Sequence, residues 1–287
     1  MSNALPSAAL NARLQAIRGF VFDMDGTLIL GDKRNNNMHT LPGAIAFLTL
    51  LRERGIPYVI MTNGTVRSAS DYVGVLSGAG IPVDQHSMMT PSSVAADYFV
   101  SQGHKRIMVL GCPGVWQPLA DVGLEVVLSS VDNPGPVDAV YIGWYREFTF
   151  KDLEAAYIAV RDGAGMFTAS DVPFFATANG PGIGTSCAIA AALQPLTGIQ
   201  ATVLGKPSQY ALNAAAARLG LPVASIAVVG DDPALEVPMA LAGGATGIFV
   251  HSGTGNSESF AHLPDADQPH LSVPVIADLM AAWLAAG

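Results

Sequence analysis

The sequence predicts an α/β protein built around a parallel sheet, and three observations support this prediction. Short runs made almost wholly of apolar residues alternate with alanine- and leucine-rich stretches that have helical spacing. Strands buried on both faces have such continuous apolar sequences, and they occur where helices cover both sides of a parallel sheet. Several of the apolar runs also end in polar or charged residues, as expected where the carboxyl ends of parallel strands meet a ligand.

The expected elements begin with an apolar strand at Phe20–Phe22. A helix over Ala44–Arg54 should end at Gly55, because glycine readily adopts the left-handed conformation that closes a helix. The remaining expected elements, in chain order, are strand Pro57–Met61, helix Ser68–Ser77, helix Ser92–Ser101, strand Arg106–Leu110, strand Ala139–Ile142, helix Leu153–Arg161, strand Thr202–Leu204, helix Tyr210–Leu219, strand Ile226–Val229 and a last buried strand Ile248–Val250.

The composition indicates a soluble globular protein. Of the 287 residues, 50% are hydrophobic and only 13% are charged, which favours a large buried core over disorder. No apolar run reaches the roughly 18 residues that a membrane-spanning helix needs. The first residues show no basic segment followed by an apolar one, as a secretion signal would. We therefore expect a cytoplasmic protein with no membrane partner.

The charge balance argues against nucleic-acid binding. The formal net charge is −9, with only 14 lysines and arginines, and no basic patch is visible that could bind a phosphate backbone. An anionic small molecule can still bind if a metal ion and local cations reverse the electrostatic field within its site.

Two carboxylates lie at the end of the first strand. Asp23 and Asp25 follow Phe22 almost directly, and Gly26 allows the sharp turn that comes next. Placing two negative charges beside a buried strand costs free energy unless something offsets them. A divalent metal ion would do so, and one carboxylate could also act as a nucleophile while the other transfers protons. The alternative is an ordinary turn in which the aspartates cap the next segment.

Three further groups of polar residues follow other predicted strands. Thr62 and Asn63 offer a hydroxyl and an amide suited to a phosphoryl oxygen. Lys206, between Gly205 and Pro207, offers a cation, and Asp231 with Asp232 offers the hard oxygen ligands that Mg²⁺ prefers. Each group alone is compatible with a turn or a solvated loop. Their shared position at strand ends indicates a common site.

These four motifs resemble those of the haloacid dehalogenase superfamily, with its Asp-x-Asp-Gly-Thr, Thr/Ser, Lys and Gly-Asp signatures. The likeness extends from about Ile17 to Leu279 and is nearest to the 4-nitrophenylphosphatase-like, or NagD-like, branch. The segments that stand where that branch has them are Leu41-Pro42-Gly43-Ala44, Met61-Thr62-Asn63-Gly64, Leu204-Gly205-Lys206-Pro207-Ser208 and Val229-Gly230-Asp231.

The resemblance implies a Rossmann-like core of residues 1–100 and 201–287 and an inserted α/β cap domain of residues 101–200. It also implies a Mg²⁺-dependent phosphatase that acts on a small phosphorylated metabolite. Asp23 would be the nucleophile that forms an aspartyl-phosphate, Asp25 would be the acid and base, and Lys206 would offset negative charge. One unit charge pair 4 Å apart is worth about 4 kcal/mol at an effective dielectric constant of 20, so this lysine matters.

The resemblance also implies the binding residues. Thr62 and main-chain amides near Met24 and Asn63 would hold the phosphoryl oxygens, with Gly64 in the same segment. In the cap, Asp171 would lie in a substrate-facing loop. The predicted Mg²⁺ ligands are Asp23, the main-chain carbonyl of Asp25 and Asp231. The resemblance is further compatible with a homodimer formed through the cap.

The sequence departs from the family pattern at one position, and it leaves other functions open. The family places a second aspartate five residues after the metal-binding one, and here that position is Glu236, so either Glu236 or Asp232 would supply the outer metal shell. Asp25 favours phosphoryl transfer over dehalogenation, because a leaving halide needs no proton. A phosphotransferase or mutase would use the same residues, and a phosphate-ligand sensor could retain the fold without catalysis. The sequence does not specify the phosphate ester.

Overall fold

The computed structural model describes residues 8–32, 37–177 and 180–287, and these residues form two compact units. The first unit comprises Met1–Thr62, Val73–Met88 and Leu212–Gly287. The second comprises Asn63–Tyr72 and Met89–Ala211. Most of the second unit is therefore one long insertion between two parts of the first.

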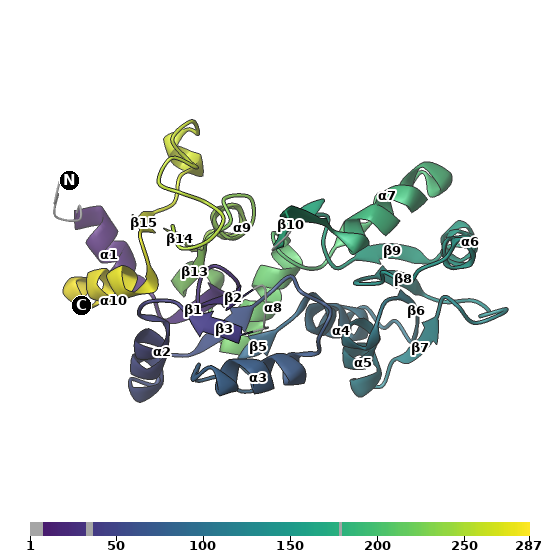
Figure 1. Ribbon diagram of the computed structural model, residues 1–287, viewed down its shortest axis with the longest axis horizontal. Helices are drawn as coiled ribbons and strands as arrows, with labels where there is room; N and C mark the ends of the chain where they lie inside the picture. The colour runs from purple at the N-terminus through teal and green to yellow at the C-terminus, as the bar shows by residue number, and fades with distance from the viewer. Residues whose placement is uncertain (1–7, 33–36, 178–179) are drawn as a thin grey trace. The chain divides into compact units, whose positions relative to one another are not determined.

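A six-stranded sheet with the order β15-β14-β13-β1-β4-β5 forms the centre of the first unit (Figure 1). β1 lies between β13 and β4 and is parallel to both, and β13–β14 and β14–β15 are also parallel pairs. The parallel pairing expected from the apolar runs is thus confirmed here. The strands are β1 (Gly19–Asp23), β4 (Tyr58–Met61), β5 (Met88–Met89), β13 (Ile226–Gly230), β14 (Thr246–Val250) and β15 (Leu271–Val273).

Aromatic packing holds helices against one face of this sheet. Phe20 and Phe22 are two residues apart in β1, so their rings lie on the same face, where they stack 5.4 Å apart. Phe47 of α2 (Ala44–Glu53) meets both rings edge-on, and Trp283 of α10 (Ile276–Ala286) meets Phe20 and Phe47. α1 (Ala8–Ala16) contacts α10, while α9 (Glu236–Gly243) contacts β13 and β14.

The second unit has a five-stranded sheet in which every neighbouring pair is parallel (Figure 1). Its order is β12-β9-β8-β6-β7. The strands are β6 (Arg106–Leu110), β7 (Glu125–Leu128), β8 (Ala139–Ile142), β9 (Gly165–Thr168) and β12 (Thr202–Val203). β6 and β8 have the bounds that their apolar runs predict.

Alternate residues of these strands face two separate helical layers. Ile107 and Val109 of β6 pack with α4 (Pro91–Ser101) and α5 (Pro113–Asp121). Met108 and Leu110 pack with α6 (Phe150–Arg161) and α7 (Thr185–Thr197) on the other side. A strand with both faces buried in this way must be apolar throughout, which explains its sequence.

The remaining elements connect these layers. Antiparallel pairs are formed by β2 (Ile29–Asp32) with β3 (Asn37–Thr40) and by β10 (Phe174–Thr177) with β11 (Gly180–Ile183). The others are helices α3 (Ala69–Gly78) and α8 (Gln209–Leu219) and the 3₁₀ turns Val223–Ser225 and Asp265–Asp267. The sequence does not predict β15, which is only partly buried and follows β14 in the same sheet. Within the described ranges, every helix is too short or too polar to cross a bilayer.

Candidate active site

Three of the predicted site residues meet at the carboxyl edge of the six-stranded sheet. In the strand register, Asp23 is opposite Met61 of β4, and Phe22 is opposite Val229 of β13. Asp23 is therefore the last residue of the central strand, and Thr62 and Asp231 come next after its two neighbours. Asp23 is 7% exposed, Thr62 3% and Asp231 2%. The sheet itself thus gathers two carboxylates and a hydroxyl that are far apart in the sequence.

Asp25 lies in the turn that follows β1, and its side chain is exposed. The main-chain nitrogen of Gly26 donates to the carbonyl of Ile29 at 2.8 Å, which closes this turn. Gly26 has a φ of +86°, a conformation that favours glycine. The turn therefore leaves one carboxylate buried at position 23 and the other open to solvent at position 25.

The Asp231 carboxylate accepts hydrogen bonds from two other segments. Its Oδ2 accepts from the main-chain nitrogen of Thr254 at 2.6 Å and from the Thr254 hydroxyl at 3.1 Å. Its Oδ1 accepts from the hydroxyl of Thr27 at 3.2 Å. Thr254 was not predicted as a site residue. The sequence does carry a signal for it, since Ser252-Gly253-Thr254-Gly255 follows an apolar strand as the four recognised motifs do.

Burial and a neighbouring negative charge act together on Asp231. Burial of the carboxyl group is the larger cause, the charge of Asp23 is the second, and together they raise the pKa of Asp231 to about 6. The hydrogen bonds from Thr254 and Thr27 act in the opposite direction. Two buried carboxylates that destabilise each other's charged form are a suitable donor set for a hard divalent cation such as Mg²⁺.

The rest of a metal shell would have to come from other oxygens. Among the described residues, no group of three or more histidine, cysteine, aspartate or glutamate side chains could hold a metal ion. Mg²⁺ is commonly bound through one or two carboxylates and keeps several waters, so the pair Asp23 and Asp231 is compatible with it.

Asp232 and Glu236, which follow β13, differ in burial and in their hydrogen-bond partners. Asp232 is half-buried, and its Oδ1 accepts from the main-chain nitrogen of Ala234 at 2.8 Å, which forms a local turn. Glu236 is 1% exposed, and its Oε2 accepts from the main-chain nitrogen of Asp232 at 3.3 Å. Glu236 also lies against Gly230, where an added Cβ would come within 2.3 Å of Oε2. Glu236 therefore supports the main chain on both sides of Asp231.

The predicted residues of the second unit are organised around Lys206. Asn63 contacts the main chain of Lys206 twice: its Oδ1 accepts from Lys206 N at 2.8 Å, and its Nδ2 donates to Lys206 O at 2.9 Å. The side chain of Lys206 is 1% exposed. A Cβ added to Gly205 would lie 2.2 Å from the carbonyl of Ala169, so only glycine fits the preceding position. The Asn63 amide group, expected to bind substrate, is thus engaged with the lysine backbone.

Gly64 and Asp171 also belong to the second unit. Gly64 is half-buried and directly follows Asn63. Asp171 is exposed and lies just before β10, and its charge contributes, after burial, to a raised pKa of the Cys187 thiol. Substrate contact by either residue stays a prediction.

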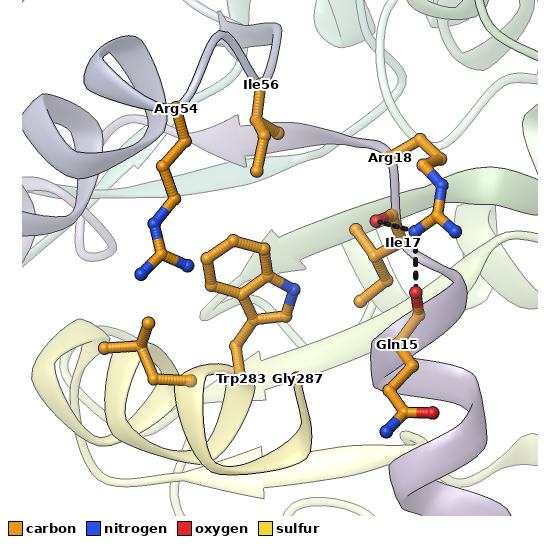
Figure 2. A pocket seen from close by; sticks show the side chains of 8 residues that line it. Gln15, Ile17, Arg18, Arg54, Ile56, Trp283 and Gly287 are labelled. Carbon is orange, nitrogen blue, oxygen red and sulfur yellow. Dashed lines mark hydrogen bonds between the residues drawn. The ribbon is translucent and has the colours of Figure 1, made fainter.

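The first unit also contains a cavity of about 430 Å³, and Figure 2 shows residues that line it. Its lining comes from segments that precede β1 and β4 and from α10, so it is at the amino ends of these strands. The Arg54 guanidinium lies over the ring of Trp283 at 5.6 Å, and Arg18 donates to the main-chain carbonyls of Gln15 and Ile17. The cations at this cavity already have partners within the protein.

Comparison with known families agrees with the geometry at the carboxyl edge. Residues 20–125 match the family model of haloacid dehalogenase-like hydrolases, and residues 203–279 match that of HAD-hydrolase-like proteins. The chain belongs to the haloacid dehalogenase-like hydrolases. The first match contains Asp23, Asp25 and Thr62, and the second contains Lys206 and Asp231. The resemblance inferred from the motifs is confirmed.

This haloacid dehalogenase-like hydrolase has relatives that match it over most of their length. It is 26% identical to the 5′-nucleotidase YutF of Bacillus subtilis, with 88% of this chain and 93% of the relative covered. It is 27% identical to an acid sugar phosphatase of Staphylococcus epidermidis, with 84% of this chain and 89% of the relative covered. The solved 4-nitrophenylphosphatase of Thermotoga maritima is 26% identical and superposes with a TM-score of 0.82, covering 94% of this chain and 98% of its own. The α/β class with a capped core is thereby confirmed.

Proposed function

We propose that this hydrolase is a Mg²⁺-dependent phosphatase that cleaves a small phosphomonoester through an aspartyl-phosphate on Asp23. The observation that supports this most is the strand register that gathers Asp23, Thr62 and Asp231 at one sheet edge. The three relatives differ in the substrates that their names give, but hydrolysis of a phosphate monoester is common to those names.

In the first step, a carboxylate oxygen of Asp23 attacks phosphorus and the bond from phosphorus to the alcohol oxygen breaks. Asp25 donates its proton to the departing oxygen, so the alcohol leaves neutral. In the second step, Asp25 takes a proton from water as the water oxygen attacks phosphorus. This step releases inorganic phosphate and restores the Asp23 carboxylate. Asp25 is exposed, so it is accessible both to the leaving alcohol oxygen and to the attacking water.

Hydrogen-bond donors near the strand ends would bind the phosphoryl group. The Thr62 hydroxyl and the main-chain nitrogens of Asn63 and Met24 would donate to its oxygens. Lys206 would offset the charge of Asp23 and of the phosphoryl group. Lys206 is 1% exposed, and a charge pair in a site screened from water is stronger than one at the surface.

Mg²⁺ would be held by Asp23, Asp231 and the main-chain carbonyl of Asp25. When bound, it supplies positive charge that stabilises the oxygens of the transferring phosphoryl group. The raised pKa of Asp231 supports this assignment, because a cation would offset the repulsion between the two carboxylates.

Substrate choice would come from a cap within the second unit. We propose that residues 101–200 form this cap, with Asp171 and the Gly64 segment facing the substrate. A homodimer through the cap and a cytoplasmic location stay predictions.

Released phosphate measured with a panel of phosphorylated metabolites, with Mg²⁺ and with a chelator, tests the proposal. Turnover that depends on Mg²⁺ and stops in Asp23→Asn supports it. Asp267, which is exposed on a 3₁₀ turn, offers a matched control, and Asp267→Asn should keep full activity. A phosphorylated isomer as the product would identify a mutase instead. Turnover in Asp23→Asn equal to that of the parent would refute the assigned nucleophile.

A further inference from the structure

The loop His251–Gly255, which follows β14, binds two catalytic turns at once. The hydroxyl of Ser252 donates to the carbonyl of Gly26 at 2.7 Å, in the turn after β1. The main-chain nitrogen of Gly255 donates to the carbonyl of Asp231 at 3.0 Å, and the Thr254 hydroxyl lies 3.2 Å from the same carbonyl. The loop therefore connects the turn that carries Asp25 to the turn that carries Asp231.

The loop also distinguishes the two oxygens of the Asp231 carboxylate. A carboxylate oxygen accepts about two hydrogen bonds, one for each lone pair. Oδ2 accepts two bonds, both from Thr254, so its acceptor capacity is used within the protein. Among the described residues, Oδ1 accepts one bond, from Thr27, at 3.2 Å. Oδ1 is thus the oxygen with capacity for a further ligand.

Two glycines confine the same carboxylate sterically. A Cβ added to Gly253 would lie 1.9 Å from Oδ2 of Asp231, and one added to Gly26 would lie 2.5 Å from it. Real atoms do not approach so closely, so the main chains on both sides touch the carboxylate directly. Rotation of Asp231 about its side-chain bonds would require one of these segments to move.

We propose that Thr254 is a positioning residue that holds Asp231 so that Oδ1 is the oxygen presented to Mg²⁺. The proposal rests on the proposed function, because it takes Asp231 as a metal ligand. Thr254 itself does not touch metal or substrate. It prevents the carboxylate from turning and keeps Oδ2 occupied, so that Oδ1 has the orientation that metal binding needs. Partners of this kind, which orient a metal ligand, typically change metal affinity about 10- to 100-fold when they are removed.

Calorimetric titration of the metal-free protein with Mg²⁺ tests this directly. Thr254→Val removes the hydroxyl and keeps the shape of the side chain, and its Kd for Mg²⁺ should rise about tenfold. Thr254→Ser restores a hydroxyl and should bind within about twofold of the parent. Thr246→Val is the matched control, because Thr246 is buried at the opposite end of β14 and lies away from Asp231. Its Mg²⁺ affinity should equal that of the parent.

The Mg²⁺ dependence of turnover provides a second measurement, which would not change if Thr254 had only a structural role. In Thr254→Val, the Mg²⁺ concentration for half-maximal turnover should rise about tenfold, while kcat at saturating Mg²⁺ stays within about twofold. Thr254 is exposed, so the substitution should leave the melting temperature nearly unchanged. If Thr254→Val does not fold, Thr254→Ala removes the same hydroxyl and takes its place.

Asp231→Asn separates the two proposals. If Asp231→Asn loses Mg²⁺ binding while Thr254→Val binds as the parent does, the role of Thr254 is refuted and the proposed function stands. If Asp231→Asn binds Mg²⁺ as the parent does, the metal site itself is wrong and the role of Thr254 falls with it. Weak binding in Thr254→Val together with recovery in Thr254→Ser supports the inference.

Discussion

Asn63 holds Lys206 by its main chain, with Asn63 Oδ1 accepting from Lys206 N at 2.8 Å and Asn63 Nδ2 donating to Lys206 O at 2.9 Å. An asparagine side chain can pair in this way with both polar groups of one residue because it carries an acceptor and donors side by side. Asn63 directly follows Thr62, which ends the β4 segment of the first unit. The lysine is thus fixed by the segment that also carries the predicted phosphate-binding hydroxyl.

Asn63→Ala should impair catalysis through Lys206. The substitution removes two hydrogen bonds, each worth about 0.5–1.5 kcal/mol, and leaves the Lys206 backbone less well placed. We expect turnover of 4-nitrophenyl phosphate to fall at least about tenfold. Asn213→Ala, at an exposed position of α8, is the control and should change neither activity nor stability appreciably. Equal activity in Asn63→Ala and the parent would show that this pairing is not needed.

Gly26→Ala should lower the Mg²⁺ affinity of the site as well as the stability of the fold. Gly123 has a φ of +85°, almost equal to the +86° of Gly26, but an added Cβ would meet nothing within 4 Å. Gly123→Ala should therefore lose about 1–2 kcal/mol of unfolding free energy and keep its activity. Gly26→Ala has the same backbone cost and also displaces Asp231, so Mg²⁺ affinity should fall at least about tenfold. Urea unfolding and Mg²⁺ titration of both variants measure the difference.

The pH dependence of stability should reveal the buried Asp231. Its pKa rises from an ordinary value of 3.8 to about 6, so between these values the folded protein binds more protons than the unfolded chain. Its contribution to the free energy of unfolding is therefore present at low pH and is lost as the pH rises through about 6. The loss amounts to about 3 kcal/mol. Mg²⁺ added at pH 7 should restore stability, since it favours the ionised carboxylate.

The comparison that isolates this effect uses Asp231→Asn, which does not titrate. Urea unfolding of the metal-free parent and of this variant should diverge between about pH 4 and pH 7, with the parent losing stability relative to the variant. Parallel pH profiles for the two proteins would contradict the raised pKa.

Glu236 and Asp232 should differ in their effect on the metal. Glu236 is buried against Gly230 and supports the Asp231 loop. Replacing a residue that supports a metal ligand typically lowers metal affinity about 10-fold or more, so Glu236→Gln should weaken Mg²⁺ binding by several-fold to about 10-fold. Asp232→Asn keeps the oxygen that accepts from Ala234 N and should bind Mg²⁺ within about twofold of the parent. The reverse order in a calorimetric titration would assign the outer shell to Asp232.

Much of the fold could be predicted because the strands are buried on both faces. Arg106–Leu110 and Ala139–Ile142 are predicted with their observed bounds, since nothing polar interrupts these apolar runs. α5 was missed because it contains Pro118, and proline normally interrupts a helix. Burial of Val115 and Leu119 from that helix shows how tertiary packing outweighs the local preference.

The site was predictable only in part. Asp23, Thr62 and Asp231 follow apolar strands, so the rule that ligands bind beyond the carboxyl ends of parallel strands identifies them. Thr254 follows an apolar strand too, but its role depends on two contacts with the Asp231 carboxylate that only the folded loop creates. The amide of Asn63 was expected to bind substrate, and its pairing with the Lys206 backbone could not be inferred from positions so far apart in the chain.

The central claim, that Asp23 accepts the phosphoryl group, is tested most directly by trapping the covalent intermediate. In Asp25→Asn, 4-nitrophenyl phosphate should still phosphorylate Asp23, because nitrophenolate leaves without a proton, but water should no longer be activated for the second step. We predict a burst of nitrophenolate equal to the enzyme concentration, and acid quenching followed by mass spectrometry should find the phosphate on the peptide that contains Asp23. A phosphate on any other residue, or the same burst when Asp23→Asn is added to Asp25→Asn, would contradict the account.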